Sequence, residues 1–161
     1  MPRSRLSRSF APAVTAALLA LGMALSGCAS TVSLEPAPEA NDPLCAEVTA
    51  YLPETVDGQQ RRWTDAQATG AWGDPAAVIL TCGVTPPGPS ELPCQTTGGV
   101  DWIIDDADAP NYRVTSFGRT PAVEVYLDTQ VVSSREVLDR LSPLVAKLPR
   151  DGECTARPGT P

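Results

Sequence analysis

The first 27 residues have a hydrophobic pattern unlike that of the remaining chain. Residues 1–10 carry three arginines and no acid, and residues 11–27 carry no charge at all. A positive start, a short apolar helix and small residues at its end are typical of a secretory signal. We therefore predict a signal peptide over residues 1–27, with an uncleaved membrane anchor as the alternative.

The apolar run ends in Leu25-Ser26-Gly27-Cys28, which reads LSGC. This order resembles the lipobox of bacterial lipoproteins, in which diacylglycerol alkylates the cysteine thiol and the chain is cut before that residue. The resemblance implies lipidation of Cys28 and makes membrane lipid a partner of the protein. Two acyl chains anchor a protein stably, because each buried methylene contributes ~0.8 kcal/mol. We expect the extracytoplasmic face of the cell membrane as the location, with simple secretion as the alternative.

Two later segments have the apolar spacing of helices. Asp42 as a cap and Pro43 at the first helical position suit a helix that runs to Leu52. Residues 133–148 place valine and leucine side chains on one stripe and open with the pattern of a capping box. Pro143 interrupts this segment, so one kinked helix and two short helices both remain open.

Between these helices lie segments with strand patterns. Residues 76–82 are almost unbroken apolar, which favours a strand buried on both faces near the centre of a sheet. Residues 94–105 read as a hairpin around Gly98-Gly99, and residues 111–118 and 122–128 alternate as half-buried antiparallel strands do. The predicted fold class is α+β, with a mostly antiparallel sheet of about five strands flanked by an N-terminal and a C-terminal helix.

The remaining segments set the domain boundaries. Residues 28–41 are small, polar and proline-containing, so we predict a flexible tether that could lift the domain about 40 Å at ~3.1 Å per residue. We predict that residues 42–155 form a single domain and that residues 156–161 form a disordered tail. Residues 53–70 predict only a polar loop that could hold one turn of helix, and Trp72 to Pro75 predict a turn.

With Cys28 lipidated, four cysteines remain, which is an even number suited to disulfides in an oxidising compartment. They are Cys45, Cys82, Cys94 and Cys154. We expect Cys82 to pair with Cys94 across a proline- and glycine-rich loop and Cys45 to pair with Cys154, although two other pairings stay open. A zinc site does not fit, because no two cysteines are two to four residues apart and the chain has no histidine.

The net charge limits the classes of partner that the protein can bind. Twelve bases minus the three that precede Cys28 leave nine against 19 acids, so the mature chain carries −10. Such a charge repels nucleic acid and anionic lipid. The single Lys147 against eleven arginines is typical of a GC-rich genome and indicates an actinobacterial source.

Catalytic chemistry is hard to place in this chain. Without histidine, the Ser–His–Asp, Cys–His and His-ligated metal mechanisms are excluded. The 19 acids offer no marked pair, and Asp105 to Asp108 lack the glycine and glutamate that a calcium loop needs, so a solvated turn is favoured. We assign no catalytic residue, no metal and no cofactor.

One basic-aromatic cluster stands out in this acidic chain. Arg61, Arg62 and Trp63 are consecutive, and we interpret them as a candidate partner contact. Trp102 alternates with apolar neighbours and is expected in the core. For Arg119, in a turn between strands, we favour an internal carboxylate over a bound anion.

Several short motifs together resemble a known family. The residues WGDPAAVILTCG (72–83), GGVDWIID (98–105) and FGRTPAVEVYL (117–127), behind the LSGC motif, resemble a family of small actinobacterial lipoproteins with an extracytoplasmic domain of unknown function. The likeness runs from about Pro43 to Cys154. It implies membrane attachment and disulfides, and it supplies no activity, cofactor or catalytic residue.

We therefore expect a non-enzymatic module that binds or scaffolds an envelope protein or glycan. The alternative is a hydrolase that acts on cell-wall or glycan material through two carboxylates.

Overall fold

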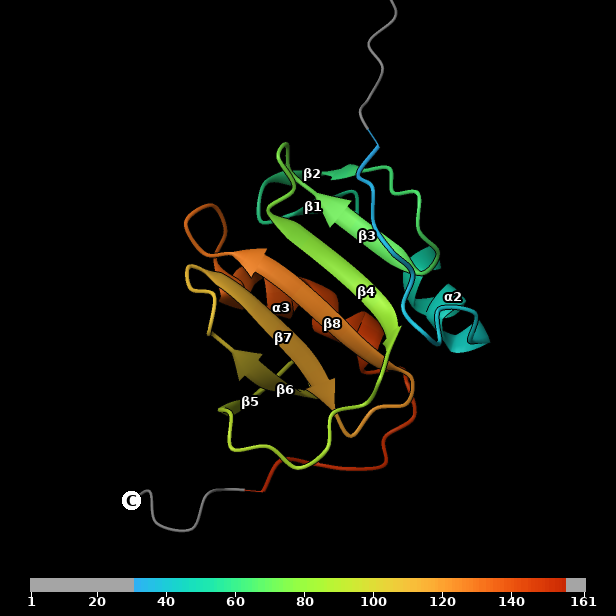
Figure 1. Ribbon diagram of the computed structural model, residues 1–161, viewed down its shortest axis with the longest axis vertical. Helices are drawn as coiled ribbons and strands as arrows, with labels where there is room; N and C mark the ends of the chain where they lie inside the picture. Colours follow the sequence, from blue (N-terminus) through green and yellow to red (C-terminus); the bar gives the residue numbers. More distant parts are fainter. Residues whose placement is uncertain (1–30, 156–161) are drawn as a thin grey trace, which may run out of the picture.

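A computed structural model describes residues 31–155 of the 161-residue chain. Within this range a single antiparallel sheet of eight strands, in the order β1-β2-β3-β4-β8-β7-β6-β5, is accompanied by two helices (Figure 1). The α+β class is confirmed, but the expected number of about five strands was wrong. The signal segment, Cys28 and the predicted tail from residue 156 lie outside the described residues.

The elements follow one another in a simple order. The helices are α2 (Pro43–Ala50) and α3 (Ser134–Val145). The strands are β1 (Thr55–Val56), β2 (Gln59–Arg62), β3 (Thr69–Trp72), β4 (Val78–Val84), β5 (Cys94–Thr97), β6 (Val100–Asp105), β7 (Asn111–Phe117) and β8 (Ala122–Asp128).

Helix α2 begins as the sequence predicts. The Asp42 carboxylate accepts a hydrogen bond from the Leu44 N–H at 2.8 Å, and Pro43 occupies the first turn, where its missing N–H costs nothing. Cys45 and Val48 are its buried side chains. Across residues 31–155 no helix combines the length and apolarity that crossing a bilayer requires.

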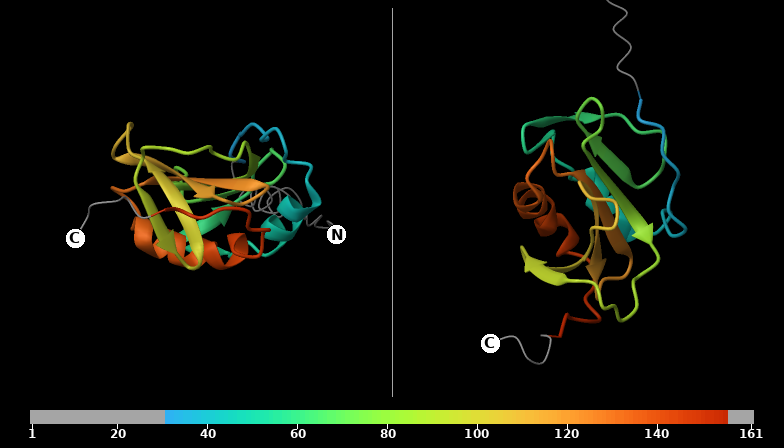
Figure 2. Two further views of the ribbon diagram at one scale, coloured as in Figure 1. Left: turned by 90° about the horizontal axis from the view of Figure 1, so that it is seen from below. Right: turned by 60° about the vertical axis from the view of Figure 1, so that its left-hand side comes forward.

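Helix α3 packs against one face of the sheet (Figure 2, left) and is a single helix, with Pro143 in its last turn. Val137, Leu141 and Val145 are fully buried on its inner side. Ser133 occupies the N-cap position, but its side chain makes no capping hydrogen bond, so this part of the predicted capping box does not form.

The core lies between this helix and the sheet, and β4 sits near the middle of the strand order, as predicted. Val78 and Leu80 are buried, whereas Ile79 and Thr81 are only half-buried. The expected burial on both faces was therefore wrong. Strand β4 alternates in the same way as β7 and β8, because the sheet has one covered face and one wet face.

Strands β1 to β3 were missed by the sequence patterns, which gave only a polar loop and a turn. Asp57 and Gly58 have positive φ angles of 45° and 76° and form the two-residue turn between β1 and β2. Trp72 closes β3 fully buried, with its indole N–H donating to the Pro53 carbonyl at 2.9 Å. These strands have only two to four residues each, which is too short to show a periodic pattern.

Two disulfides form among the four predicted cysteines, but the expected pairing was wrong. Cys45 bonds to Cys82, and Cys94 bonds to Cys154. The cause is the strand order: β4 and β5 are separated by three other strands, so Cys82 and Cys94 lie far outside the ~7 Å Cα separation that a disulfide allows. Helix α2 instead lies beside β4 and brings Cys45 to Cys82.

Residues 31–41, expected within a flexible tether, contact the domain instead. The Val32 N–H donates to the Trp63 carbonyl at 2.8 Å, and the Glu39 N–H donates to the Gly83 carbonyl at 2.9 Å. A Cβ atom at Gly83 would come within 2.4 Å of the Glu39 backbone, and this residue has φ +91°, so the close approach requires glycine. Ala40 is buried beside it.

Candidate functional site

The structure brings the predicted basic-aromatic cluster to a hollow of about 600 Å³. We call this the Trp63 hollow. It lies between α2 and β2, and residues 63–64 and 68–69 complete its lining. Its lining consists of Ala46, Thr49, Ala50, Glu54, Arg61, Arg62, Trp63, Thr64, Ala68 and Thr69.

Arg61 is held in the wall of the hollow by the chain that leads from α2 into β1. Its backbone N–H donates to the Glu54 carbonyl at 2.8 Å, and its Nη1 donates to the Leu52 carbonyl at 3.1 Å. Arg61 as a whole is half-buried. Its position is therefore fixed before any partner arrives, which lowers the entropic cost of binding.

Arg62, the next residue of β2, is also held within the domain. Its Nη1 donates to the Gly73 carbonyl at 3.0 Å and forms an ion pair with Asp74 at 2.8 Å. The Arg62 side chain is 14% exposed and that of Asp74 is 79% exposed. The charge of Arg62 is thus partly balanced within the domain.

Trp63 is the most exposed large hydrophobic side chain in the described part of the chain, at 77%. Trp72 and Trp102 are fully buried, so the prediction that Trp102 belongs to the core is confirmed. An indole in water is a large apolar surface with a polar N–H, a combination that is enriched at interfaces. Trp63 thus gives this rim of the hollow a large apolar surface in contact with water.

Asp65 fastens the N-terminal segment beside the hollow. Its two carboxylate oxygens accept hydrogen bonds from the Leu34 N–H and from the Ser33 hydroxyl, each at 2.8 Å. These hydrogen bonds, first that of Leu34 and then that of Ser33, lower the pKa of Asp65. The carboxylate is accordingly charged and bonded at neutral pH.

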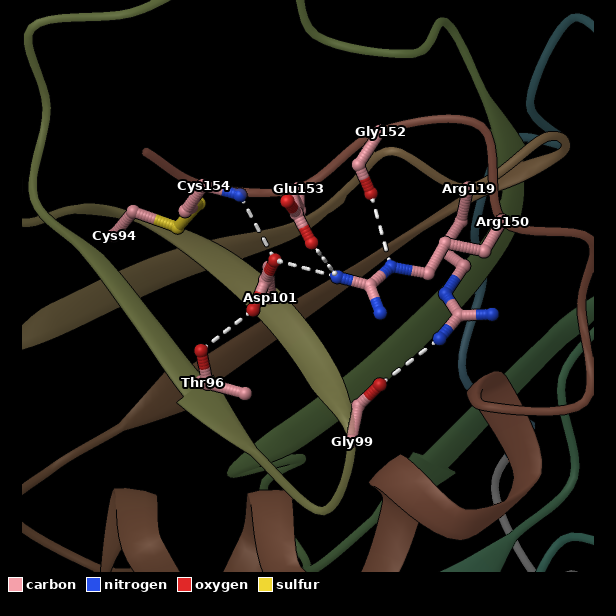
Figure 3. A network of polar contacts seen from close by, with 9 residues as sticks. All are labelled: Cys94, Thr96, Gly99, Asp101, Arg119, Arg150, Gly152, Glu153 and Cys154. Atoms are coloured by element: carbon pink, nitrogen blue, oxygen red, sulfur yellow. Dashed lines mark hydrogen bonds and ion pairs between the residues drawn. A yellow bond between two sulfur atoms is a disulfide. The ribbon is translucent and has the colours of Figure 1, made fainter. Parts of the chain in front are cut away.

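A second polar region surrounds Asp101 at the other end of the sheet (Figure 3). Its carboxylate accepts from the Thr96 hydroxyl at 2.6 Å and from the Cys154 N–H at 2.9 Å, and it lies 3.9 Å from Arg150. Burial raises the pKa of Asp101, but these hydrogen bonds and the charges of Arg150 and Arg119 outweigh it, so the pKa is lowered. The region therefore stabilises a buried carboxylate.

Arg119 belongs to the same region, and its hydrogen bonds go to backbone carbonyls rather than to the internal carboxylate that we favoured. It donates to Leu148 at 2.6 Å, to Ala146 at 3.2 Å and to Gly99 at 2.9 Å (Figure 3 shows the last of these). Burial and the charge of Arg150 lower its pKa, while nearby carboxylates oppose this. Arg119 joins the end of α3 to the β5–β6 turn, so this region is structural.

A third feature, which the sequence did not single out, lies on the wet face of the sheet. A hollow of about 250 Å³ is lined by Leu34, Ile79, Thr81, Arg113, Glu124 and Tyr126. Arg113 pairs with Glu124 at 3.2 Å and lies 5.7 Å from the centre of the Tyr126 ring. The alternation along β7 and β8 places Arg113, Glu124 and Tyr126 on one face of the sheet. This alternation was the sequence signal from which the cluster could have been predicted.

Acids do not gather into a site within residues 31–155. No group of three or more acids or cysteines that could hold a metal occurs there. Asp105 is the last residue of β6 and Asp106 to Asp108 lie in the exposed turn after it, where the Asp105 carboxylate accepts from the Ala107 N–H at 3.0 Å. In the lining of the Trp63 hollow, Glu54 is the one acid.

Comparisons with curated proteins and with solved structures gave no significant match. A family model described as "Protein of unknown function (DUF3515)" matches residues 10–152, which is most of the chain. The expectation of a family without a known activity is thereby confirmed in its general form. The protein belongs to the DUF3515 family.

Proposed function

We propose that this protein is a lipid-anchored module on the extracytoplasmic face of the cell membrane, where it binds or scaffolds an envelope partner. The observation that carries the binding role is the Trp63 hollow, whose lining includes Arg61 and Arg62, each held by hydrogen bonds within the domain, and the exposed Trp63. Tryptophan and arginine are the residues that most often dominate the free energy of binding at interfaces.

Two observations support the location. The LSGC motif ending at Cys28 matches the order of residues at which bacterial lipoproteins are acylated. The two disulfides suit an oxidising compartment, since the cytosol keeps thiols reduced.

The arginine-rich, lysine-poor composition supports an actinobacterial source.

Binding is favoured over hydrolysis by the lining of the hollow. A glycosidase of the usual type places two carboxyl groups about 5–9 Å apart across its substrate. Glu54 alone supplies a carboxylate to the wall of the Trp63 hollow, and the hollow otherwise offers arginines, threonines, alanines and an indole. These groups suit recognition of an envelope protein or glycan.

The anchoring half of the proposal is tested by replacing Cys28 with alanine. We expect the protein to leave the membrane fraction for the soluble or unprocessed fraction. The control is the Cys94→Ala and Cys154→Ala pair, which removes one disulfide and keeps Cys28, and should remain in the membrane fraction. Equal membrane association of both variants would contradict lipid anchoring at Cys28.

The binding half is tested by photo-crosslinking in living cells. A photoreactive phenylalanine analogue replaces Ala46, an exposed residue in the wall of the hollow. We expect mass spectrometry to identify one reproducible adduct. The same analogue at Val131, which is 53% exposed and outside the hollow, is the control. An identical set of adducts from both positions would argue against the hollow as the binding site.

A further inference from the structure

The chain between the anchor and the folded domain is short. Val32 follows Cys28 by four residues, which span at most about 14 Å even when fully extended. The Val32 N–H bonds directly to the Trp63 carbonyl at 2.8 Å. The Trp63 backbone therefore lies within roughly 20 Å of the Cys28 backbone, whatever the conformation of the residues between them. The 40 Å reach expected of a free tether does not apply.

This attachment is made at several points. Asp65 accepts two hydrogen bonds, from Ser33 and Leu34, directly after the contact of Val32. Further along, the Glu39 N–H bonds to Gly83 of β4 and Ala40 is buried. Because these contacts reinforce one another, releasing one of them does not free the whole segment.

The surface next to this attachment suits a bilayer interface. Trp63 is 77% exposed, and tryptophan is enriched at the headgroup level of membranes, where the ring is apolar and its N–H finds polar partners. Each headgroup layer is about 5–7 Å thick, which is within reach of a domain held this closely. The mature chain carries −10, so an aromatic contact is better suited to such a surface than an electrostatic one.

We propose that Trp63 rests in the headgroup layer of the membrane to which Cys28 is attached, so that the partner of this rim is the lipid surface itself. The inference rests on the proposed acylation of Cys28. It gives the domain a fixed orientation, with the Trp63 hollow opening beside the bilayer. The envelope partner is then met at the membrane surface rather than at a distance from it.

The fluorescence of tryptophan tests this arrangement. The acylated protein is purified in detergent and reconstituted into phosphatidylcholine vesicles, either plain or brominated near the carbonyl end of the acyl chains. Trp72 and Trp102 are fully buried, so Trp63 is the tryptophan that can meet a brominated chain. We expect the brominated lipid to lower the fluorescence of the wild type, and acrylamide in the water to quench Trp63 less in vesicles than in detergent.

Two variants make the test specific. Trp63→Phe keeps an aromatic ring at an exposed position and should lose the effect of bromine. Leu92→Ala removes an exposed side chain from the loop between β4 and β5, which lies at the opposite end of the molecule from residue 31 (Figure 1), and should keep it.

The outcomes separate the two proposals. Equal quenching by bromine in the wild type and in Trp63→Phe would overturn the headgroup contact, while flotation of the protein with the vesicles would still support anchoring. Failure to float with the vesicles would overturn both.

Discussion

The two ends of the domain are fastened in opposite ways. At the N-terminal end the disulfide Cys45–Cys82 is fully buried. The carboxylate of Asp65, which binds residues 33 and 34, is exposed. At the C-terminal end the disulfide of Cys94 and Cys154 is at least partly exposed, and the carboxylate that holds the chain, Asp101, is buried. Each end therefore combines one buried and one accessible attachment.

The two disulfides allow the contribution of burial to stability to be compared with that of chain entropy. The disulfides close segments of 37 and 60 residues, for which the chain-entropy account gives about 4 kcal/mol of stabilisation in each case and slightly more for the longer one. Entropy alone would thus rank the exposed disulfide first. Packing reverses the order, because the sulfurs of Cys45 and Cys82 fill the core between α2 and β4.

The largest effect is expected from removing the buried disulfide. The Cys45→Ala and Cys82→Ala pair should lower the free energy of unfolding by about 4 kcal/mol, because the unfolded chain is no longer crosslinked. Each deleted buried sulfur should add about 0.5–1.5 kcal/mol, as other small deletions in cores do. The free energy of unfolding from denaturant titration is the measurement.

The control for this prediction is the Cys94→Ala and Cys154→Ala pair. It should cost only the entropic part, about 4 kcal/mol, because Cys94 is exposed and leaves no buried gap. If this pair is the more destabilising of the two, loop length outweighs burial and the comparison between the two ends is wrong.

A smaller effect is expected from the buried carboxylate. Asp101→Asn keeps the shape of the side chain but removes the charge that Arg150 and the Cys154 N–H meet. Hydrogen bonds to charged groups contribute about 1.5–3 kcal/mol, so replacing them by neutral ones should cost about 1–2 kcal/mol. Thermal unfolding at pH 7 measures it, with Asp108→Asn in the exposed turn as a control that should leave the midpoint unchanged.

Acid should remove the same contribution. The pKa of Asp101 is lowered in the folded protein, because hydrogen bonds and positive charge outweigh burial. Its contribution is therefore complete above its ordinary pKa of 3.8 and is lost as the pH falls through the lowered value. Unfolding free energies between pH 7 and pH 3 should fall less steeply in Asp101→Asn than in the wild type. Parallel curves would show that Asp101 is not the group that titrates.

Much of the fold could be read from the sequence, and the misses have a common cause. Strands β4 to β8 and helix α2 have long periodic patterns or strong turn and cap residues, such as Gly98-Gly99 and Asp42. Strands β1 to β3 have two to four residues each, and β2 is wholly polar. The Asp57-Gly58 pair was the one strong hairpin signal there. Disulfide pairing needs the strand order, which no local pattern contains.

The candidate site was only half visible in the sequence. Arg61, Arg62 and Trp63 are neighbours in the chain, so local composition revealed them. The opposite wall comes from Ala46 and Thr49 of α2, small residues that become part of a hollow only once the fold places them opposite Arg61 and Trp63. The attachment of residues 31–41 was hidden for a similar reason, because a small polar segment resembles a tether until its partners are known.

The smallest effect is expected at the exposed carboxylate of the N-terminal end. Asp65→Ala removes the acceptor of the Leu34 N–H and of the Ser33 hydroxyl, and because Asp65 is exposed we expect little change in global stability. The change should be local: hydrogen exchange of the Leu34 amide should become several-fold faster, while that of Leu80 in the core strand β4 stays the same. Glu47→Ala, which removes an exposed acid from α2, is the matched control.

The same contact should respond to acid in the wild type. Its hydrogen bonds lower the pKa of Asp65, so the carboxylate holds residues 33 and 34 above pH 3.8 and releases them as the pH falls through the lowered value. The amide proton shift of Leu34 in NMR spectra should follow this protonation, with a midpoint below 3.8. A midpoint at or above that value would mean that Asp65 does not hold this segment. The N-terminal end of the domain would then be secured by the buried disulfide and the backbone contacts of Val32 and Glu39 alone.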